Sequence, residues 1–124
     1  MSQSPLTFSS AIPILRIFDE PRAREFYVDY LGFTVEFEHR FADDLPLYMC
    51  LRLGNCHLHL SEHSGDGTPG SRLHIEVSDI DAFHASLDTS YKYAHPSIEP
   101  KPWGVREVAV ADPFSNVLHF FTPN

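Results

Sequence analysis

The opening part of the chain changes from the alternation of a strand to the periodicity of a helix. Residues 11–17 predict a strand, in which Pro13 suits an edge position because an edge needs no ladder hydrogen bond there. Asp19 is a favourable helix N-cap, and Gly32 is placed as a C-terminal cap. Between these caps the apolar residues recur with the spacing of a helix buried on one face, namely Ala23, Phe26, Tyr27, Tyr30 and Leu31.

Short alternating segments follow this predicted helix. Residues 34–40, 47–53 and 56–61 each have the composition of a strand, with a hairpin turn between the last two. Residues 62–71 are rich in turn-forming residues and have no apolar period, so we expect a linker there. The order of elements up to the linker is therefore βαβββ.

The same order returns after the linker. The predicted elements are a strand at 72–78, a helix capped by Asp79, an irregular segment at 91–97, and strands at 105–111 and 117–121. Asp19 and Asp79 occupy equivalent strand-to-helix junctions about 60 residues apart, which indicates a divergent tandem repeat.

The sequence thus predicts an α+β fold of two tandem βαβββ modules that form curved mixed sheets. We expect one domain over residues 1–124, with module one at about 8–62, the linker at about 62–71 and module two at about 72–124. Helices would cover the convex side of each sheet and leave a concave face open. Concave, partly apolar faces of this kind bind small ligands.

Composition and charge limit the class of protein. A hydrophobic content of 43% fits a folded globule, and no apolar run is long enough to span a bilayer. Residues 1–5 lack the basic start and apolar stretch of a secretory signal, so we expect a cytoplasmic protein. The formal net charge of -8 argues against nucleic-acid binding and suits a cationic small molecule as partner. Alternatively, the acidity serves solubility alone.

Cysteines and histidines are the candidates for metal or redox chemistry. Cys50 and Cys56 lack the C-x-x-C spacing, so we expect buried thiols instead of a zinc or redox pair. A metal site built from strands needs imidazole or carboxylate groups that converge from several of them. The candidates on predicted strands are His59, His74 or Glu76, and His119. The alternative is that these polar residues line a cavity or surface.

Aromatic residues offer a different kind of site, because the chain has no nucleophile elbow and no phosphate-binding glycine loop. Phe33, Phe37 and Phe41 lie four apart, and Trp103 is the single Trp of the chain. We expect Phe33 in the core. Phe37 and Trp103 neighbour polar or turn residues, so each is either a core plug or a platform on which a flat, cationic ligand stacks.

Segments spread over nearly the whole chain carry a resemblance to a known family. They are Ala11-Ile12-Pro13-Ile14-Leu15, Glu25-Phe26-Tyr27, Leu31-Gly32-Phe33, Pro102-Trp103-Gly104 with Arg106-Glu107, and Asp112-Pro113 with Asn116 and His119-Phe120. Together they resemble bleomycin resistance proteins of the glyoxalase/vicinal-oxygen-chelate superfamily. The resemblance implies paired βαβββ modules, often exchanged between the two chains of a homodimer, and the position of Pro13 is associated with that exchange.

Metal-using members of this superfamily carry one ligand on the first and one on the last strand of each module. Carried over to this chain, the resemblance implies Ile12 and Arg72 at the first-strand positions, and His59 and His119 at the last-strand positions. Isoleucine cannot coordinate a metal and arginine almost never does, so the usual metal site looks broken. The resemblance then favours the members that sequester a cationic glycopeptide drug in a crevice at the dimer interface.

We therefore expect a homodimeric protein that binds a bleomycin-like antibiotic without metal, cofactor or catalysis and so confers resistance. The expected ligand-binding residues are Phe37, Phe41, His59, His74, Trp103, Glu107 and His119. Trp103 should face the crevice, and His119 should line it without holding a metal. Two alternatives stay open: a lyase, isomerase or dioxygenase that uses a divalent metal such as Zn, Ni, Mn or Fe, and a catalytically silent interaction domain.

Overall fold

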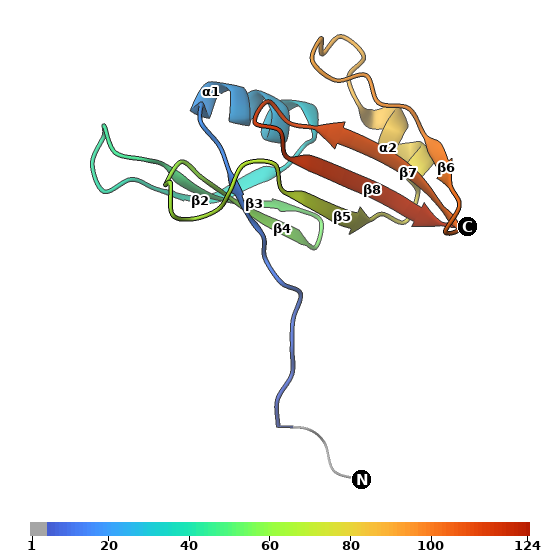
Figure 1. The fold of residues 1–124 in the computed structure, drawn as a ribbon, viewed down its shortest axis with the longest axis horizontal. Coiled ribbons are helices and arrows are strands. Elements are labelled where there is room, and N and C mark those ends of the chain that lie inside the picture. Colours follow the sequence, from blue (N-terminus) through green and yellow to red (C-terminus); the bar gives the residue numbers. More distant parts are fainter. Residues whose placement is uncertain (1–4) are drawn as a thin grey trace.

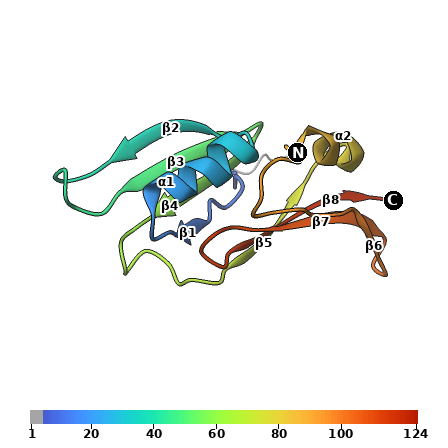
Figure 2. The ribbon, with the colours of Figure 1, turned by 90° about the horizontal axis from the view of Figure 1, so that it is seen from above.

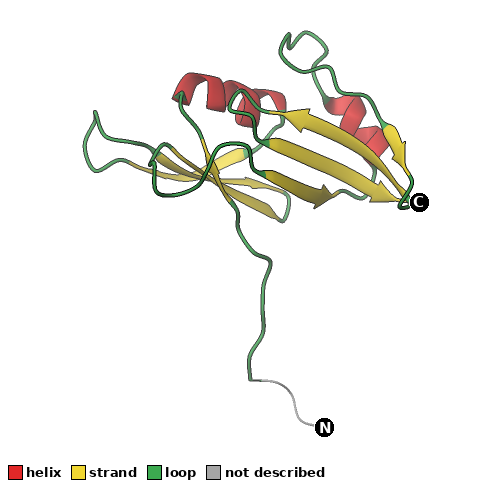
Figure 3. Ribbon diagram, in the orientation of Figure 1, coloured by secondary structure: helices red, strands yellow, loops and turns green. Residues whose placement is uncertain are grey.

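The computed structural model describes residues 5–124, which form two similar modules side by side (Figure 1). Module one contains β1 (Ile14–Arg16), α1 (Glu20–Ala23), η1 (Arg24–Tyr30), β2 (Thr34–His39), β3 (Tyr48–Leu53) and β4 (Cys56–Ser61). Module two contains β5 (Arg72–Glu76), α2 (Ile80–Ser86), β6 (Glu99–Lys101), β7 (Val105–Ala111) and β8 (Val117–Pro123). Each module thus has the order βαβββ, which Figure 3 shows coloured by type of element.

Each module builds one four-stranded mixed sheet. The strand orders are β1-β4-β3-β2 and β5-β8-β7-β6. The first strand of each module pairs in parallel with the last, and the other pairs are antiparallel. Both views place β2 and β6 at opposite ends of the molecule (Figure 1, Figure 2). The predicted α+β fold of two βαβββ modules is confirmed.

The helical segment of module one begins and ends at the predicted caps. The Asp19 side chain accepts a hydrogen bond of 3.1 Å from the Arg22 backbone N–H and so caps α1. The chain continues through the π-helix η1 and turns at Gly32, whose φ of 92° strongly favours glycine. The buried face of this segment consists of the predicted residues Ala23, Phe26, Tyr27, Tyr30 and Leu31.

The helix of module two is shorter. The Asp79 side chain accepts a hydrogen bond of 3.1 Å from the Ala82 N–H and caps α2, as predicted, but α2 ends after 7 residues. The corresponding segment of module one has 4 residues in α1 followed by 7 in η1. The centre of the sheet of module two is still covered, since Val108, Val110, Leu118 and Phe120 are buried, but β5 is not. Leu73 and Ile75 stay half-buried, whereas Leu15 on the equivalent strand of module one is fully buried.

Some local predictions were wrong. The first strand begins at Ile14 instead of residue 11, because its pairing with β4 starts there, opposite His59. The N-terminal part of the chain before it extends from the body of the molecule (Figure 1). The strand β6 was not predicted, since it has 3 residues and contains Pro100, which cannot donate a ladder hydrogen bond. Cys50 and Cys56 are free and half-buried instead of buried: Cys50 lies on the side of β3 opposite Met49 and Leu51, and Cys56 is the first residue of β4.

A buried polar cluster joins the two modules. The Tyr27 hydroxyl donates to Oδ2 of Asp112 at 2.6 Å. The Asn116 side-chain amide donates to the same oxygen at 2.9 Å and to the Arg16 carbonyl at 3.0 Å. Buried polar atoms are costly unless they are paired, so these bonds fix one module against the other.

One apolar core extends through both modules beneath their helices. Its fully buried members include Leu15, Leu51 and Leu60 from module one, and Val108, Leu118 and Phe120 from module two. Phe33 also lies in this core, as predicted. Within residues 5–124, no helix combines the length and apolarity needed to cross a membrane.

Candidate functional site

The sheet surfaces that face away from the helices carry most of the predicted site residues. In β4, Leu58 and Leu60 are fully buried, whereas His57 is exposed and His59 is half-buried. This alternation confirms that the two histidines lie opposite the leucines. We call this side of the two sheets the open face; by strand register it carries Phe37 and His59 in module one, and His74, Glu107 and His119 in module two.

On the open face of module one, Tyr48 holds the ring of His59. The Tyr48 hydroxyl lies 2.7 Å from Nδ1 of His59, and the two rings meet edge to face at 5.3 Å. Burial, together with the nearby Cys50 and Asp66, raises the pKa of Tyr48, so the phenol stays protonated at neutral pH. A ligand would meet the imidazole of His59 through its other nitrogen, Nε2.

On the open face of module two, His119 is held through both ring nitrogens. Its Nδ1 lies 2.8 Å from Oε2 of Glu107, and its Nε2 lies 3.1 Å from Nη1 of Arg72. The His74 ring stacks on it at 4.6 Å with an interplanar angle of 12°. A guanidinium group only donates, so Nε2 accepts from Arg72 and Nδ1 carries the hydrogen that Glu107 accepts. Contacts within the chain therefore fix the orientation of this imidazole.

Tyr48 and Glu107 occupy equivalent places in the two modules. Tyr48 lies opposite Ser61 in the strand register, and Glu107 lies opposite Phe121. On the last strand of each module, His59 lies two residues before Ser61, and His119 lies two residues before Phe121. His59 and His119 are thus corresponding residues, and a residue at the same position of the neighbouring strand bonds Nδ1 of each. This residue is Tyr48, a phenol, in module one and Glu107, a carboxylate, in module two.

Phe37 and Phe41 line a hollow of about 500 Å³ at the β2 end of module one. The other residues that line it are His39, Tyr48, His63 and Asp66. The rings of Phe37 and His39 are nearly parallel at 6.5 Å, and Phe41 meets His39 edge-on at 4.6 Å. Phe37 is 58% exposed and Phe41 is 77% exposed, so both rings can be reached by a ligand. We call this group the aromatic hollow.

Trp103 lies on the turn between β6 and β7 and is 64% exposed. The Gly104 N–H donates to the Lys101 carbonyl at 3.1 Å and closes the turn. The Lys101 ammonium lies 6.0 Å from the centre of the indole, so the ring already attracts a cation. Because β2 and β6 are at opposite ends of the molecule, one chain does not bring Trp103 and Phe37 together (Figure 2).

The open face does not fit a metal site of the kind that the resemblance implies. The strand register places Ile14 beside His59 and His74 beside His119, two residues further along than Ile12 and Arg72. The partner of His59 is still an isoleucine, and both nitrogens of His119 are engaged. In the described part of the chain, no three His, Cys, Asp or Glu side chains are grouped so as to hold a metal ion. We therefore derive no chemistry through a metal.

Several residues of the site were not predicted from the sequence. In β3, Tyr48 and Cys50 alternate with the buried residues Met49 and Leu51. This alternation could have placed Tyr48 on the open face. His63 and Asp66 come from the linker, where no periodicity indicates which side chains face the sheet. Asp66 is fixed there because its Oδ2 accepts a hydrogen bond of 2.8 Å from the Ser61 hydroxyl.

Comparison with known proteins agrees with this fold. The family model described as "Glyoxalase superfamily protein" matches residues 2–123, so the chain belongs to the glyoxalase superfamily. A search of curated protein sequences finds no significant match.

Solved structures with the same fold include proteins that bind antibiotics. A bleomycin resistance determinant encoded on the transposon Tn5 is 21% identical, with a TM-score of 0.70 over 94% of this chain and 99% of that one. TnmS3, an antibiotic-binding protein from Streptomyces sp. CB03234, is 20% identical, with a TM-score of 0.70 over 96% and 99%. A bleomycin-binding protein complexed with bleomycin is 21% identical, with a TM-score of 0.67 over 94% and 100%. At these identities, the likeness establishes the fold.

Proposed function

We propose that this protein binds and sequesters a cationic, partly aromatic antibiotic of the bleomycin kind on its open face, without metal, cofactor or catalysis, and thereby confers resistance. The aromatic hollow is the observation that carries this proposal. It combines two exposed phenyl rings, Phe37 and Phe41, with the carboxylate of Asp66. Aromatic faces and a carboxylate together favour a flat, positively charged ligand.

The overall charge supports the same class of ligand. The chain carries 17 Asp and Glu against 9 Lys and Arg, which gives a formal net charge of -8. Such an excess raises the local concentration of cations and increases their rate of association. It also disfavours phosphorylated ligands and nucleic acids.

The contacts of His119 favour binding over acid–base catalysis. Glu107 and Arg72 engage both of its ring nitrogens, whereas Tyr48 engages only Nδ1 of His59. A general base must have a nitrogen free to take a proton from the substrate. His119 lacks such a nitrogen in this arrangement, so its role here is to present a fixed polar surface beside His74.

The geometry favours a binding crevice made by two chains. Phe37 and Trp103 lie at opposite ends of one chain, so they can contact the same ligand only if module one of one copy faces module two of another. Such an arrangement places each Trp103 over the aromatic hollow of the partner copy. It also makes the interface isologous, with two equivalent crevices in one homodimer.

Calorimetric titration with bleomycin tests this function. We expect saturable binding that weakens as salt is added, because screening reduces the attraction between the acidic protein and the cationic drug. Analytical ultracentrifugation of the same sample tests the dimer. Absence of binding would contradict the proposed ligand, and a monomer that binds with full affinity would contradict the shared crevice.

A further inference from the structure

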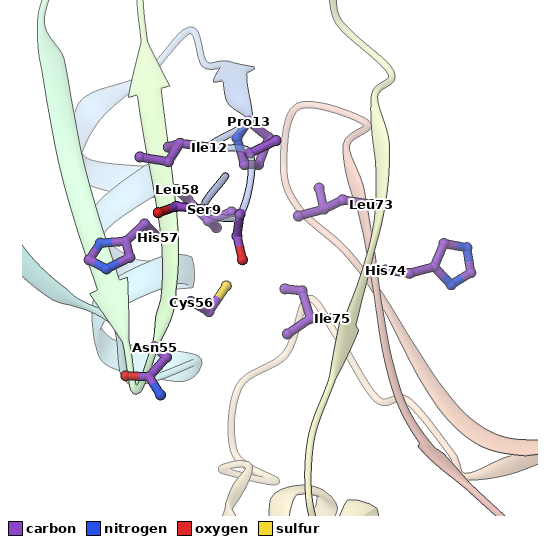
Figure 4. A pocket seen from close by; sticks show the side chains of 12 residues that line it. Ser9, Ile12, Pro13, Asn55, Cys56, His57, Leu58, Leu73, His74 and Ile75 are labelled. Carbon is purple, nitrogen blue, oxygen red and sulfur yellow. The ribbon is translucent and has the colours of Figure 1, made fainter. Parts of the chain in front are cut away.

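A separate cavity of about 670 Å³ lies between the two modules, away from the aromatic hollow. Its walls come from the segment at 9–13, from the β3–β4 hairpin and from β5. Apolar side chains make up most of the wall, and the main ones are Ile12, Pro13, Leu58, Leu73 and Ile75 (Figure 4).

The side chains of β5 show that this cavity is on the helix side of the sheets. Leu73 and Ile75 point into it, whereas the imidazole of His74 between them points away (Figure 4). The imidazole of His57, on the opposite wall, also points away. Because His74 belongs to the open face, the cavity and the open face lie on opposite sides of β5.

The cavity lies where β5 is incompletely covered. Leu15 in β1 is covered completely, while Ile75 at the equivalent place in β5 is only half-buried. The apolar side chains Leu73 and Ile75 of β5 thus face the hairpin and the segment at 9–13 (Figure 4).

We propose that this cavity is a second binding site, for a neutral and mainly apolar small molecule. Its volume falls within the range of about 300–1,000 Å³ that is typical of small-molecule sites. The residues that line it include no Asp, Glu, Lys or Arg. A charged ligand would therefore lose its hydration without gaining an ion pair in the cavity. Ser9, Ser10 and Asn55 supply the neutral hydrogen-bonding groups. The ligand class therefore differs from the cation proposed for the open face.

The two cysteines make this proposal directly testable. The Cys56 sulfur points into the cavity (Figure 4), whereas Cys50 lies opposite Phe37 and His59 in the strand register and so belongs to the open face. Both thiols are half-buried, and burial raises the pKa of each. Cys50 is therefore a matched internal control for Cys56.

The probe is the neutral fluorophore N-phenyl-1-naphthylamine, added to the full chain. We expect saturable fluorescence enhancement, and slower alkylation of Cys56 by iodoacetamide, followed by mass spectrometry, with no change at Cys50. Ile75→Asn places an amide in the cavity and should weaken probe binding about tenfold or more. Glu76→Gln, one residue along β5 and pointing to the other side, should leave probe binding unchanged.

Two results would overturn the proposal: absence of saturable probe binding, and protection of Cys50 instead of Cys56. Both are measured on the unmodified protein, so neither depends on whether a variant folds. Probe binding that disappears as protein concentration rises would assign the cavity to a second copy of the chain and would also overturn it. None of these outcomes depends on whether bleomycin binds the open face.

Discussion

The hydroxyl of Tyr27, in the helical segment of module one, donates to Oδ2 of Asp112 in module two at 2.6 Å, across 85 positions of sequence. Both side chains are buried, and burial together with the charge of Asp112 raises the pKa of Tyr27 well above its ordinary value. Asp112 Oδ1 also accepts from the backbone N–H groups of Phe114 and Asn116, each at 2.8 Å. The carboxylate thus shapes the β7–β8 turn and joins this turn to the other module.

Removal of the Tyr27 hydroxyl should destabilise the fold. We expect Tyr27→Phe to lower the free energy of unfolding by about 1–3 kcal/mol, because a buried carboxylate oxygen loses a hydrogen bond. Urea unfolding followed by circular dichroism measures this change. Tyr93→Phe is the control, since Tyr93 is 55% exposed and should change stability by less than about 0.5 kcal/mol. Equal effects of the two substitutions would contradict the role given to the buried bond.

Stability should depend on pH through Glu20. Its hydrogen bond to Arg24, aided by the charges of Arg24 and Arg40, lowers the pKa of Glu20. A lowered folded-state pKa means that the stabilisation is present above the ordinary carboxyl pKa and is lost as pH falls through the folded value. Glu20→Gln should therefore cost up to about 1 kcal/mol at neutral pH and almost nothing in acid.

Urea unfolding at neutral and acidic pH measures this dependence. Glu25→Gln is the matched control, because Glu25 is an exposed carboxylate in the same helical segment. A cost of Glu20→Gln that stays constant across this pH range would contradict the assignment.

The tautomer of His119 is a direct test of the contacts in module two. Arg72 can only donate, so the neutral ring should carry its hydrogen on Nδ1 and direct it to Glu107. Two-bond ¹H–¹⁵N correlation spectra distinguish this form from the Nε2–H form. The Arg72→Gln variant should relax the preference, since a glutamine side chain can also accept. An Nε2–H tautomer in the unmodified protein would contradict the proposed hydrogen-bond pattern.

The two aromatic residues proposed for the shared crevice should matter for binding. Phe37→Ala and Trp103→Ala should each weaken binding of bleomycin about tenfold or more, through loss of a stacking surface. Tyr93→Ala is the matched control, because Tyr93 is 55% exposed beside Lys92 and lies outside the aromatic hollow. If Trp103→Ala binds as well as the unmodified protein, the stacking role of Trp103 is wrong.

Local signals in the sequence predicted most of the fold. Asp19, Gly32 and Asp79 mark helix ends by their own chemistry, and the alternation in β4 predicted which side of the sheet His59 occupies. The family resemblance gave Ile12 as the first-strand position beside His59, whereas the pairing of β1 with β4 places Ile14 there, and no local pattern in the sequence encodes that register. The approach of Asp66 to Phe37 depends on how the linker packs, and no local pattern encodes that packing.

The proposed function requires the open face to bind a cationic, partly aromatic antibiotic. Isothermal titration of the full chain with bleomycin at low salt tests it most directly. We expect saturable heat with one ligand bound per chain, as two equivalent crevices in a homodimer require. Heat no greater than that of dilution, measured on folded protein, would contradict it.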